Sequence, residues 1–371
     1  MNKLWIMLAV SLAMAWIVEE RDRELRYRGF RRRERLVTGL LTLILIFFSG
    51  LRIWGNDTTI YIEIYELLIP TIDKLNASNI PSVSEGFGFF YLNSLLKTLG
   101  FSAQDYLMFF AVVTVIPYVL FVRKHSVSFV FGVFLMFTTG FYTFSMAAIK
   151  QAMATGLCLM AVDAALDRKW WRYSLWLVAA MLFHPYAVIY GLVPLLMFRP
   201  LTNLTYFYMV AFMVAGFFLE SLLGTVLSVT DMMGAKYDET SFVGEGVNLF
   251  RVAVSFVPVI LAMLYGKPLF RGSSREVNLM FNMAMVNALI MFVGIFGTAN
   301  YFARLANYFL PAQVIILPWL LKKAHPRDQS WLIPGCIVGY LGYFIYENAI
   351  IRPFDTGYAH MSFWDYIGRF F

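Results

Sequence analysis

The segment SGLRIWGNDTTIYIEIYE, residues 49–66, combines a cation, three acids and tyrosines directly after an apolar stretch. Arg52 ends that stretch, and Asp57 and Tyr61 follow within a few residues. Opposite charges and tyrosines at one membrane boundary, in so apolar a chain, are more typical of a site for a polar substrate than of packing alone. The alternative is interfacial anchoring beside an ordinary loop turn, because Trp and Tyr are enriched at membrane boundaries.

Two further cations lie in settings that suit an anionic ligand. Lys150 stands among the small residues of MAAIKQAMATG, which let helices approach closely or leave room for a ligand, and Gln151 follows it. Arg304 lies with Tyr301 in the aromatic sequence ANYFARLANYF. Arg and Lys at one depth would form a phosphate clamp, in which Arg can bind two oxygens at once. The alternatives are anchoring of Arg304 at the membrane boundary and extension of the Arg52 side chain to the headgroups.

Three residues are candidates for a proton acceptor. His184, which precedes Pro185, suits a general base or a donor to a phosphate or hydroxyl, and its alternative is a buried histidine with a structural partner. Asp57 and Glu85 could take the proton of an attacking hydroxyl. Their alternatives are a turn or helix-cap aspartate and a carboxylate that stabilises a helix N-terminus. Which of the three is the base stays open.

The elements that must position these residues are membrane helices. The chain has 371 residues, of which 60% are hydrophobic and 14% charged, and its apolar stretches match the length that a bilayer core requires. We predict an all-α polytopic protein, a single integral membrane domain over residues 1–371. The net charge of +7 comes from short basic clusters between apolar spans, which set topology and do not indicate nucleic acid. Cys158 and Cys336 lie in apolar runs and predict no disulfide.

About twelve spans are expected, some of them short or re-entrant. A pair of short helices fits residues 173–198 better than one span, because both flanks are basic. The other spans are 4–18, 36–51, 103–122, 127–145, 147–166, 203–228, 249–265, 277–297, 305–321 and 330–346. Basic clusters then fall on the cytoplasmic side, and the outer face receives an amphipathic helix over 87–99 within segment 52–102, a loop over 229–248 and an aromatic tail over 347–371.

Several motifs of soluble enzymes are absent from the sequence. It contains no nucleotide-binding glycine loop, no HExxH, no Cys-His spacing for a metal and no GxSxG. A soluble-style nucleotide or zinc enzyme is therefore disfavoured, and neither a cofactor nor a catalytic metal is expected.

The motifs together resemble the EpsG family of exopolysaccharide polymerases, relatives of Wzy-type O-antigen polymerases. The resemblance covers most of the chain and rests on GLRIWGNDTTIYIEIYE, EGFGFFYLNSLLKTLG, AAIKQAMATG, FHPYAVIY and YFARLANYF. The chain departs from the family pattern at Lys150, where arginine is usual, and at His184-Pro185, where the family usually has His-x-Ser. At Lys150, the bidentate contact that an arginine makes with phosphate would become a point-charge contact.

The resemblance implies a multi-pass enzyme of the bacterial inner membrane whose active site faces the periplasm. It would join oligosaccharide repeat units carried on undecaprenyl diphosphate, and a chain-length regulator is a possible partner besides the lipid bilayer. The fold would be similar to the GT-C-type glycosyltransferases that use lipid-phosphosugars. The resemblance implies Arg52, Lys150 and Arg304 for the diphosphate, and Asp57, Glu85 or His184 for the acceptor. Gln151, Tyr61 and Tyr301 would line the substrate-binding site.

Three other functions are weighed against this one. A lipid-linked oligosaccharide transporter would distribute charged residues through both halves of the bilayer, whereas here they gather at one face. A glycan ligase would add a single unit to a different acceptor. A membrane-bound O-acyltransferase would need a histidine facing a cytoplasmic acyl donor, and His184 is expected on the other face.

Overall fold

The computed structural model describes residues 2–28, 34–76, 86–218, 246–297, 299–351 and 359–370. Helices dominate these residues; no β-strand occurs among them, and the single antiparallel bridge joins Arg52 to His360. The all-α prediction is confirmed for this part of the chain. Glu85, most of the predicted loop 229–248 and residues 352–358 and 371 of the predicted tail 347–371 lie outside the described residues.

The long helices follow the predicted apolar stretches closely. They are α1 (Asn2–Tyr27), α2 (Leu36–Gly50), α5 (Ala103–His125), α6 (Phe129–Thr138), α7 (Phe141–Ala147), α8 (Ile149–Leu166), α9 (Trp170–Phe183), the 3-10 helix η4 (Pro185–Leu196), α10 (Asn203–Phe217), α12 (Leu249–Tyr265), α13 (Arg275–Val293), α14 (Ala299–Asn307), α15 (Leu310–Lys323) and α16 (Pro326–Ile345). Shorter elements are α3 (Thr58–Glu63), η1 (Ile64–Leu68), η2 (Ile72–Lys74), α4 (Phe87–Thr98), η6 (Lys267–Phe270), η7 (Tyr346–Ile351) and α17 (Phe363–Ile367).

Three helices of the described part, α5, α8 and α13, are long and apolar enough to cross a membrane. Two bent pairs, α6 with α7 at 45° and α14 with α15 at 56°, raise the number to five. Four more apolar helices, α2, η4, α10 and α12, are shorter. The chain is a membrane protein, and the count of about twelve spans stays a prediction.

Local sequence explains where several helices begin and break. Ser102 and Asp105 form a capping box that starts α5, with the Ser102 N–H donating to Asp105 Oδ2 over 3.0 Å. Gly140, at φ +81°, separates α6 from α7, because a left-handed residue ends a helix and glycine adopts that conformation freely. Pro311 lies in the first turn of α15, a position that proline favours.

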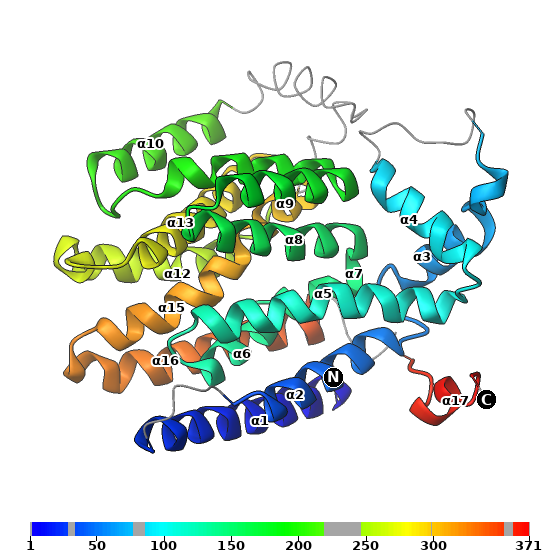
Figure 1. Cartoon of the computed structure of the whole chain (residues 1–371). Coiled ribbons are helices and arrows are strands. Elements are labelled where there is room, and N and C mark those ends of the chain that lie inside the picture. Colours follow the sequence, from blue (N-terminus) through cyan, green and yellow to red (C-terminus); the bar gives the residue numbers. More distant parts are fainter. Residues whose placement is uncertain are drawn as a thin grey trace.

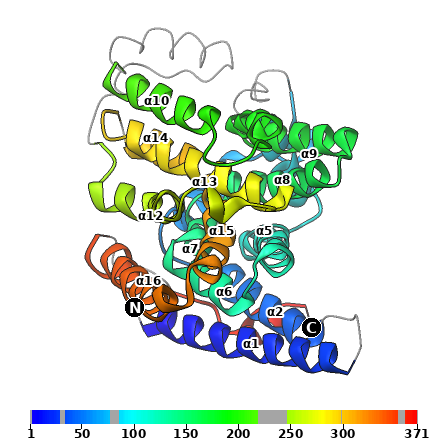
Figure 2. The ribbon, with the colours of Figure 1, turned by 90° about the vertical axis from the view of Figure 1, so that its left-hand side faces the viewer.

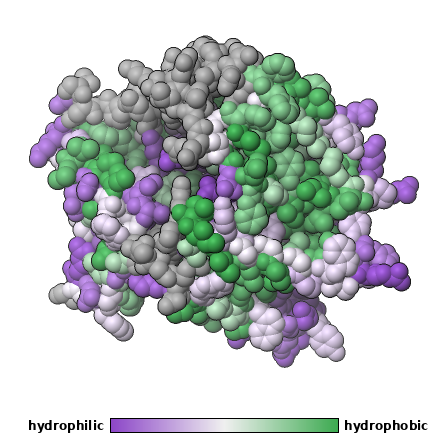
Figure 3. All heavy atoms as spheres, turned by 180° about the vertical axis from the view of Figure 1, so that it is seen from behind, coloured by the Kyte–Doolittle hydropathy of each residue, from purple (hydrophilic) through white to green (hydrophobic). Residues whose placement is uncertain are grey.

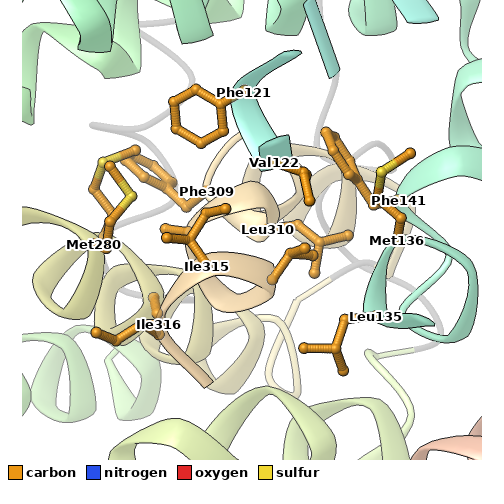
Figure 4. Close-up of a cluster of buried hydrophobic side chains, with 14 of the residues drawn as sticks. Phe121, Val122, Leu135, Met136, Phe141, Met280, Phe309, Leu310, Ile315 and Ile316 are labelled. Carbon is orange, nitrogen blue, oxygen red and sulfur yellow. The ribbon is translucent and has the colours of Figure 1, made fainter. Parts of the chain in front are cut away.

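The core lies where α5, α6, α7, α13 and α15 meet. Figure 4 shows side chains of these helices interdigitating, among them Phe121, Met136, Phe141, Met280 and Ile315, which are all at least 95% buried. Figure 2 shows α13 and α15 near the middle of the bundle. Other helices expose apolar faces instead, and Figure 3 shows a wide apolar area on one side of the molecule. An apolar surface of this extent suits contact with lipid.

The connections that carry the basic clusters gather at one end of the bundle, here called the basic end. Arg123 forms an ion pair with Asp22, which joins α5 to α1, and Lys124 Nζ lies 2.9 Å from Asp163 Oδ1 in α8. His125 adds α13, because its Nδ1 lies 2.7 Å from Glu276 Oε1. Figure 1 shows α3, α4 and α17 at the opposite end, on the right, here called the site end. The amphipathic helix expected over 87–99 is present there as α4.

Candidate functional site

Lys150 lies where the first turns of α4 and α8 meet the end of α9. Its Nζ lies 5.9 Å from the ring centroid of Phe89 in α4. A Cβ added at Gly86, the residue before α4, would lie 2.5 Å from that Nζ and 2.8 Å from the carbonyl oxygen of Phe183. Gly86 also has φ +87°. Only glycine therefore allows the α4 backbone to approach the ammonium group this closely.

Tyr61 in α3 connects Lys150 with three of the other candidates. The backbone N–H of Lys150 donates to its hydroxyl, and Asp57, Arg304 and Arg52 are the charged side chains that act on it. Burial first, and then the Asp57 carboxylate, raise the pKa of Tyr61 above its usual value, and the two arginines only partly oppose this shift. The phenol consequently stays protonated and neutral beside the cations.

The Arg52 side chain is 1% exposed, so it does not extend to the headgroups. Its Nε donates to Thr58 Oγ1 over 3.0 Å, and its Nη1 lies 3.2 Å from Ser49 Oγ and also donates to the Ser49 carbonyl. The guanidinium thus fastens the end of α2 to the start of α3. Its placement as part of a diphosphate clamp stays a prediction, while its role in positioning Asp57 and Tyr61 follows directly from these bonds.

Gln151 joins the start of α8 to α14. Its Nε2 donates to the Arg304 carbonyl oxygen over 2.5 Å, which fixes the backbone that carries the exposed Arg304 side chain. The Gln151 side chain is 2% exposed, and its Oε1 has no hydrogen-bond partner in the described part of the chain. A buried amide oxygen without a donor is costly, so Gln151 Oε1 is an unsatisfied acceptor at the start of α8.

His184 occupies the break between α9 and η4. Its backbone is extended, with φ −147° and ψ 107°, as the residue before a proline prefers. The chain reverses there: the Tyr173 hydroxyl in α9 donates to the Tyr190 carbonyl in η4 over 2.5 Å. The pair of short helices expected over 173–198 is therefore present. Lys150 and Arg304 are the charged side chains that act on the His184 ring.

Aromatic rings surround His184. The Tyr308 hydroxyl lies 2.8 Å from its Nδ1, and the Tyr186 ring lies 5.3 Å from the imidazole. Tyr186 in turn meets Tyr301 edge to face, with ring centroids 5.6 Å apart. This arrangement brings Tyr301, a predicted substrate-lining residue, to the same cluster.

The structure thus gathers eight of the nine predicted site residues at the site end, from four separate parts of the chain. They are Arg52, Asp57, Tyr61, Lys150, Gln151, His184, Tyr301 and Arg304. The ninth, Glu85, lies outside the described residues, although its neighbour Gly86 contacts Lys150. Within the described ranges, no group of three or more His, Cys, Asp or Glu residues could hold a metal ion.

Sequence reasoning missed Gly86, Thr58, Tyr186 and Tyr308. Thr58 and Gly86 carried a signal, because each lies next to a predicted residue, Asp57 or Glu85. Tyr308 lies in YFARLANYF, four residues after Arg304, but nothing in that sequence indicates that its hydroxyl reaches a histidine 124 residues away.

Comparison with known proteins gives a family match over nearly the whole chain. The family model for EpsG matches residues 35–366. The chain belongs to the EpsG family. The matched range contains all the candidate residues, and membership of this family points to a polymerase of exopolysaccharide, glycosyltransferase-like in its general chemistry. No curated protein and no solved structure matches the chain.

Proposed function

We propose that this EpsG-family protein joins oligosaccharide repeat units carried on undecaprenyl diphosphate into exopolysaccharide or O-antigen. The site end would face the periplasm and the basic end the cytoplasm, as expected when basic clusters set the topology. The remaining apolar helices would complete about twelve spans in a GT-C-like arrangement. Both donor and acceptor would be lipid-linked glycans.

One observation carries the proposal: Tyr61 lies within the influence of Arg52, Arg304 and Asp57 and accepts the Lys150 N–H. Two arginines and one carboxylate thus act on the same phenol, whose hydroxyl also accepts from the backbone of Lys150. Lys150 also stands in the first turn of α8, where the helix dipole disfavours a cation. A lipid diphosphate is an anion of the kind that a helix N-terminus and cationic side chains bind.

The chemistry needs no nucleotide, because the donor brings its own leaving group. An acceptor hydroxyl attacks C1 of the donor sugar, the C1–O bond to the diphosphate breaks, and the hydroxyl proton passes to a carboxylate such as Asp57. Lys150 and Arg304 stabilise the negative charge that develops on the departing diphosphate. Gln151 Oε1 would receive a sugar hydroxyl, and Tyr301 with Tyr186 would offer apolar ring faces to the glycan.

The test uses purified protein in nanodiscs with a lipid-linked repeat unit, and glycan length is read on a gel. The wild type should give a ladder of longer glycans. Lys150→Ala and Asp57→Ala should each lower chain extension by about 10²–10³-fold, the usual effect of removing one stabilising group, and Arg52→Ala should also abolish it. Lys322→Ala, an exposed lysine of the basic end, is the control.

Other outcomes would point elsewhere. Transfer of a single unit to a different acceptor would indicate a ligase, and movement of the lipid-linked glycan across the bilayer without transfer would indicate a transporter. Normal polymer length in the Lys150, Asp57 and Arg52 variants would refute the site itself.

A further inference from the structure

Tyr308 is held rigidly beside His184. It lies at the bend between α14 and α15 and is 0% exposed. Its carbonyl oxygen accepts a hydrogen bond of 2.6 Å from the Tyr190 hydroxyl, and the Tyr190 carbonyl accepts one from Tyr173. These bonds tie Tyr308 to η4 and α9, the two helices that flank His184. Its hydroxyl therefore meets Nδ1 at a fixed position.

The direction of the bond between Tyr308 and His184 follows from counting donors and acceptors. If Nδ1–H donated to the phenol oxygen, the phenol proton would need another acceptor, and the described residues offer none to this fully buried hydroxyl. An unsatisfied buried donor is costly. If the phenol donates to Nδ1, both groups are satisfied. Two cations near the ring also disfavour a third positive charge there.

Nε2 then carries the single proton of a neutral imidazole. No residue in the described ranges forms a hydrogen bond with Nε2, and the histidine is partly exposed. Its N–H is thus free to donate to a ligand held by Lys150 and Arg304. A protonated Nε2 has no lone pair with which to accept a proton.

We propose that Tyr308 is a positioning residue that fixes His184 in the Nε2–H tautomer, so that His184 donates a hydrogen bond to the anionic ligand and is not the base. On the proposed function, that ligand is the diphosphate of the lipid-linked donor. The proton of the acceptor hydroxyl then goes to a carboxylate. This assignment separates two roles that the sequence leaves combined in one residue.

The first experiment measures the tautomer itself and does not depend on any activity. The protein is labelled with ¹⁵N at its four histidines, and the His184 signal is identified by its loss in His184→Gln. We expect a protonated Nε2 and an unprotonated Nδ1 at neutral pH. Tyr308→Phe should give a mixture of tautomers. Tyr142→Phe, which removes a buried hydroxyl that donates to the Leu45 carbonyl outside this network, should leave the tautomer unchanged.

An Nδ1–H tautomer or an imidazolium in the wild type would overturn the proposal. So would an equal effect of Tyr142→Phe and Tyr308→Phe, because the Tyr308 hydroxyl would then act only through general packing. If the wild type makes no polymer but shows the Nε2–H tautomer that depends on Tyr308, the proposed function fails while the positioning role of Tyr308 stands.

The second experiment asks what His184 does, using conservative replacement. The glutamine amide can place an N–H near the position of Nε2 but cannot act as a base. We expect His184→Gln to extend chains at least tenfold faster than His184→Ala. Tyr308→Phe should slow extension by about 2- to 10-fold, the value of one neutral hydrogen bond. Equal inactivity of His184→Gln and His184→Ala would refute the donor role.

Discussion

Replacement of Gly86 by alanine should move the Lys150 ammonium without removing any group that would bind substrate. The new Cβ would lie 2.5 Å from Nζ and 2.8 Å from the Phe183 carbonyl oxygen. Because non-bonded atoms pack at about 3.5–4 Å, the ammonium must shift by about 1 Å. A displacement of that size at a reacting centre can cost about 10²-fold in rate. We therefore expect Gly86→Ala to reduce chain extension by about 100-fold.

Gly100 offers a matched control for this variant. It has φ +82°, almost the same as the +87° of Gly86, but a Cβ added there would meet nothing within 4 Å. Both alanine variants pay the same strain for a left-handed residue, about 1–2 kcal/mol. Gly86→Ala should lose somewhat more thermal stability, because the Phe183 carbonyl must also shift, and only Gly86→Ala should lose polymerisation. Equal activity of the two variants in the gel assay would refute the placement of Lys150 in the site.

Two further substitutions test how the site is held in place. Thr58→Val removes the hydroxyl that accepts from Arg52 Nε, and the loss of this bond to a buried charge should lower the free energy of unfolding by about 1.5–3 kcal/mol. Thermal unfolding of the purified protein measures this effect, with Thr59→Val as the control. Equal destabilisation by the two variants would contradict the prediction. Lys97→Met removes an ammonium that donates to the carbonyls of Tyr65, Glu66 and Ile69 over 2.9, 2.9 and 2.7 Å. Amide hydrogen exchange over residues 64–70 should become faster, whereas Lys322→Met should leave it unchanged, and no change in either variant would show that other contacts hold η1.

Sequence patterns predicted the helices well, because each depends on a few neighbouring residues. The start of the expected span 103–122, where α5 begins at Ala103, and the break at His184-Pro185 are examples. The bend between α14 and α15 was not predicted: residues 298–304 were expected to be an outer connection, yet Ala299–Asn307 forms a helix. A proline in the first turn of α15 lets a new helix start there, so the expected span 305–321 is divided between the end of α14 and α15.

The convergence of charges at the site end was predictable from topology, but the burial of individual side chains was not. Arg52 is enclosed by groups from distant segments: Gln104 donates to its carbonyl over 3.3 Å, and His360 pairs with it across 308 residues of chain. The hydrogen bond between Tyr308 and His184 depends equally on tertiary packing. The structural role of Arg52 and the positioning of His184 by Tyr308 rest on contacts between residues far apart in the sequence, so local sequence patterns could not predict them.

Helix α8 runs without interruption from Lys150 at the site end to Asp163 at the basic end, a rise of about 20 Å at 1.5 Å per residue. Asp163 is gripped there by Lys124 and His125, and His125 also meets Glu276. The basic end of α8 is therefore held in place by the ion pair and hydrogen bond of Asp163. A force that a bound anion exerts on Lys150 along the helix axis is opposed by these contacts of Asp163. The position of Lys150 along that axis therefore depends on residues that lie about 20 Å from the site.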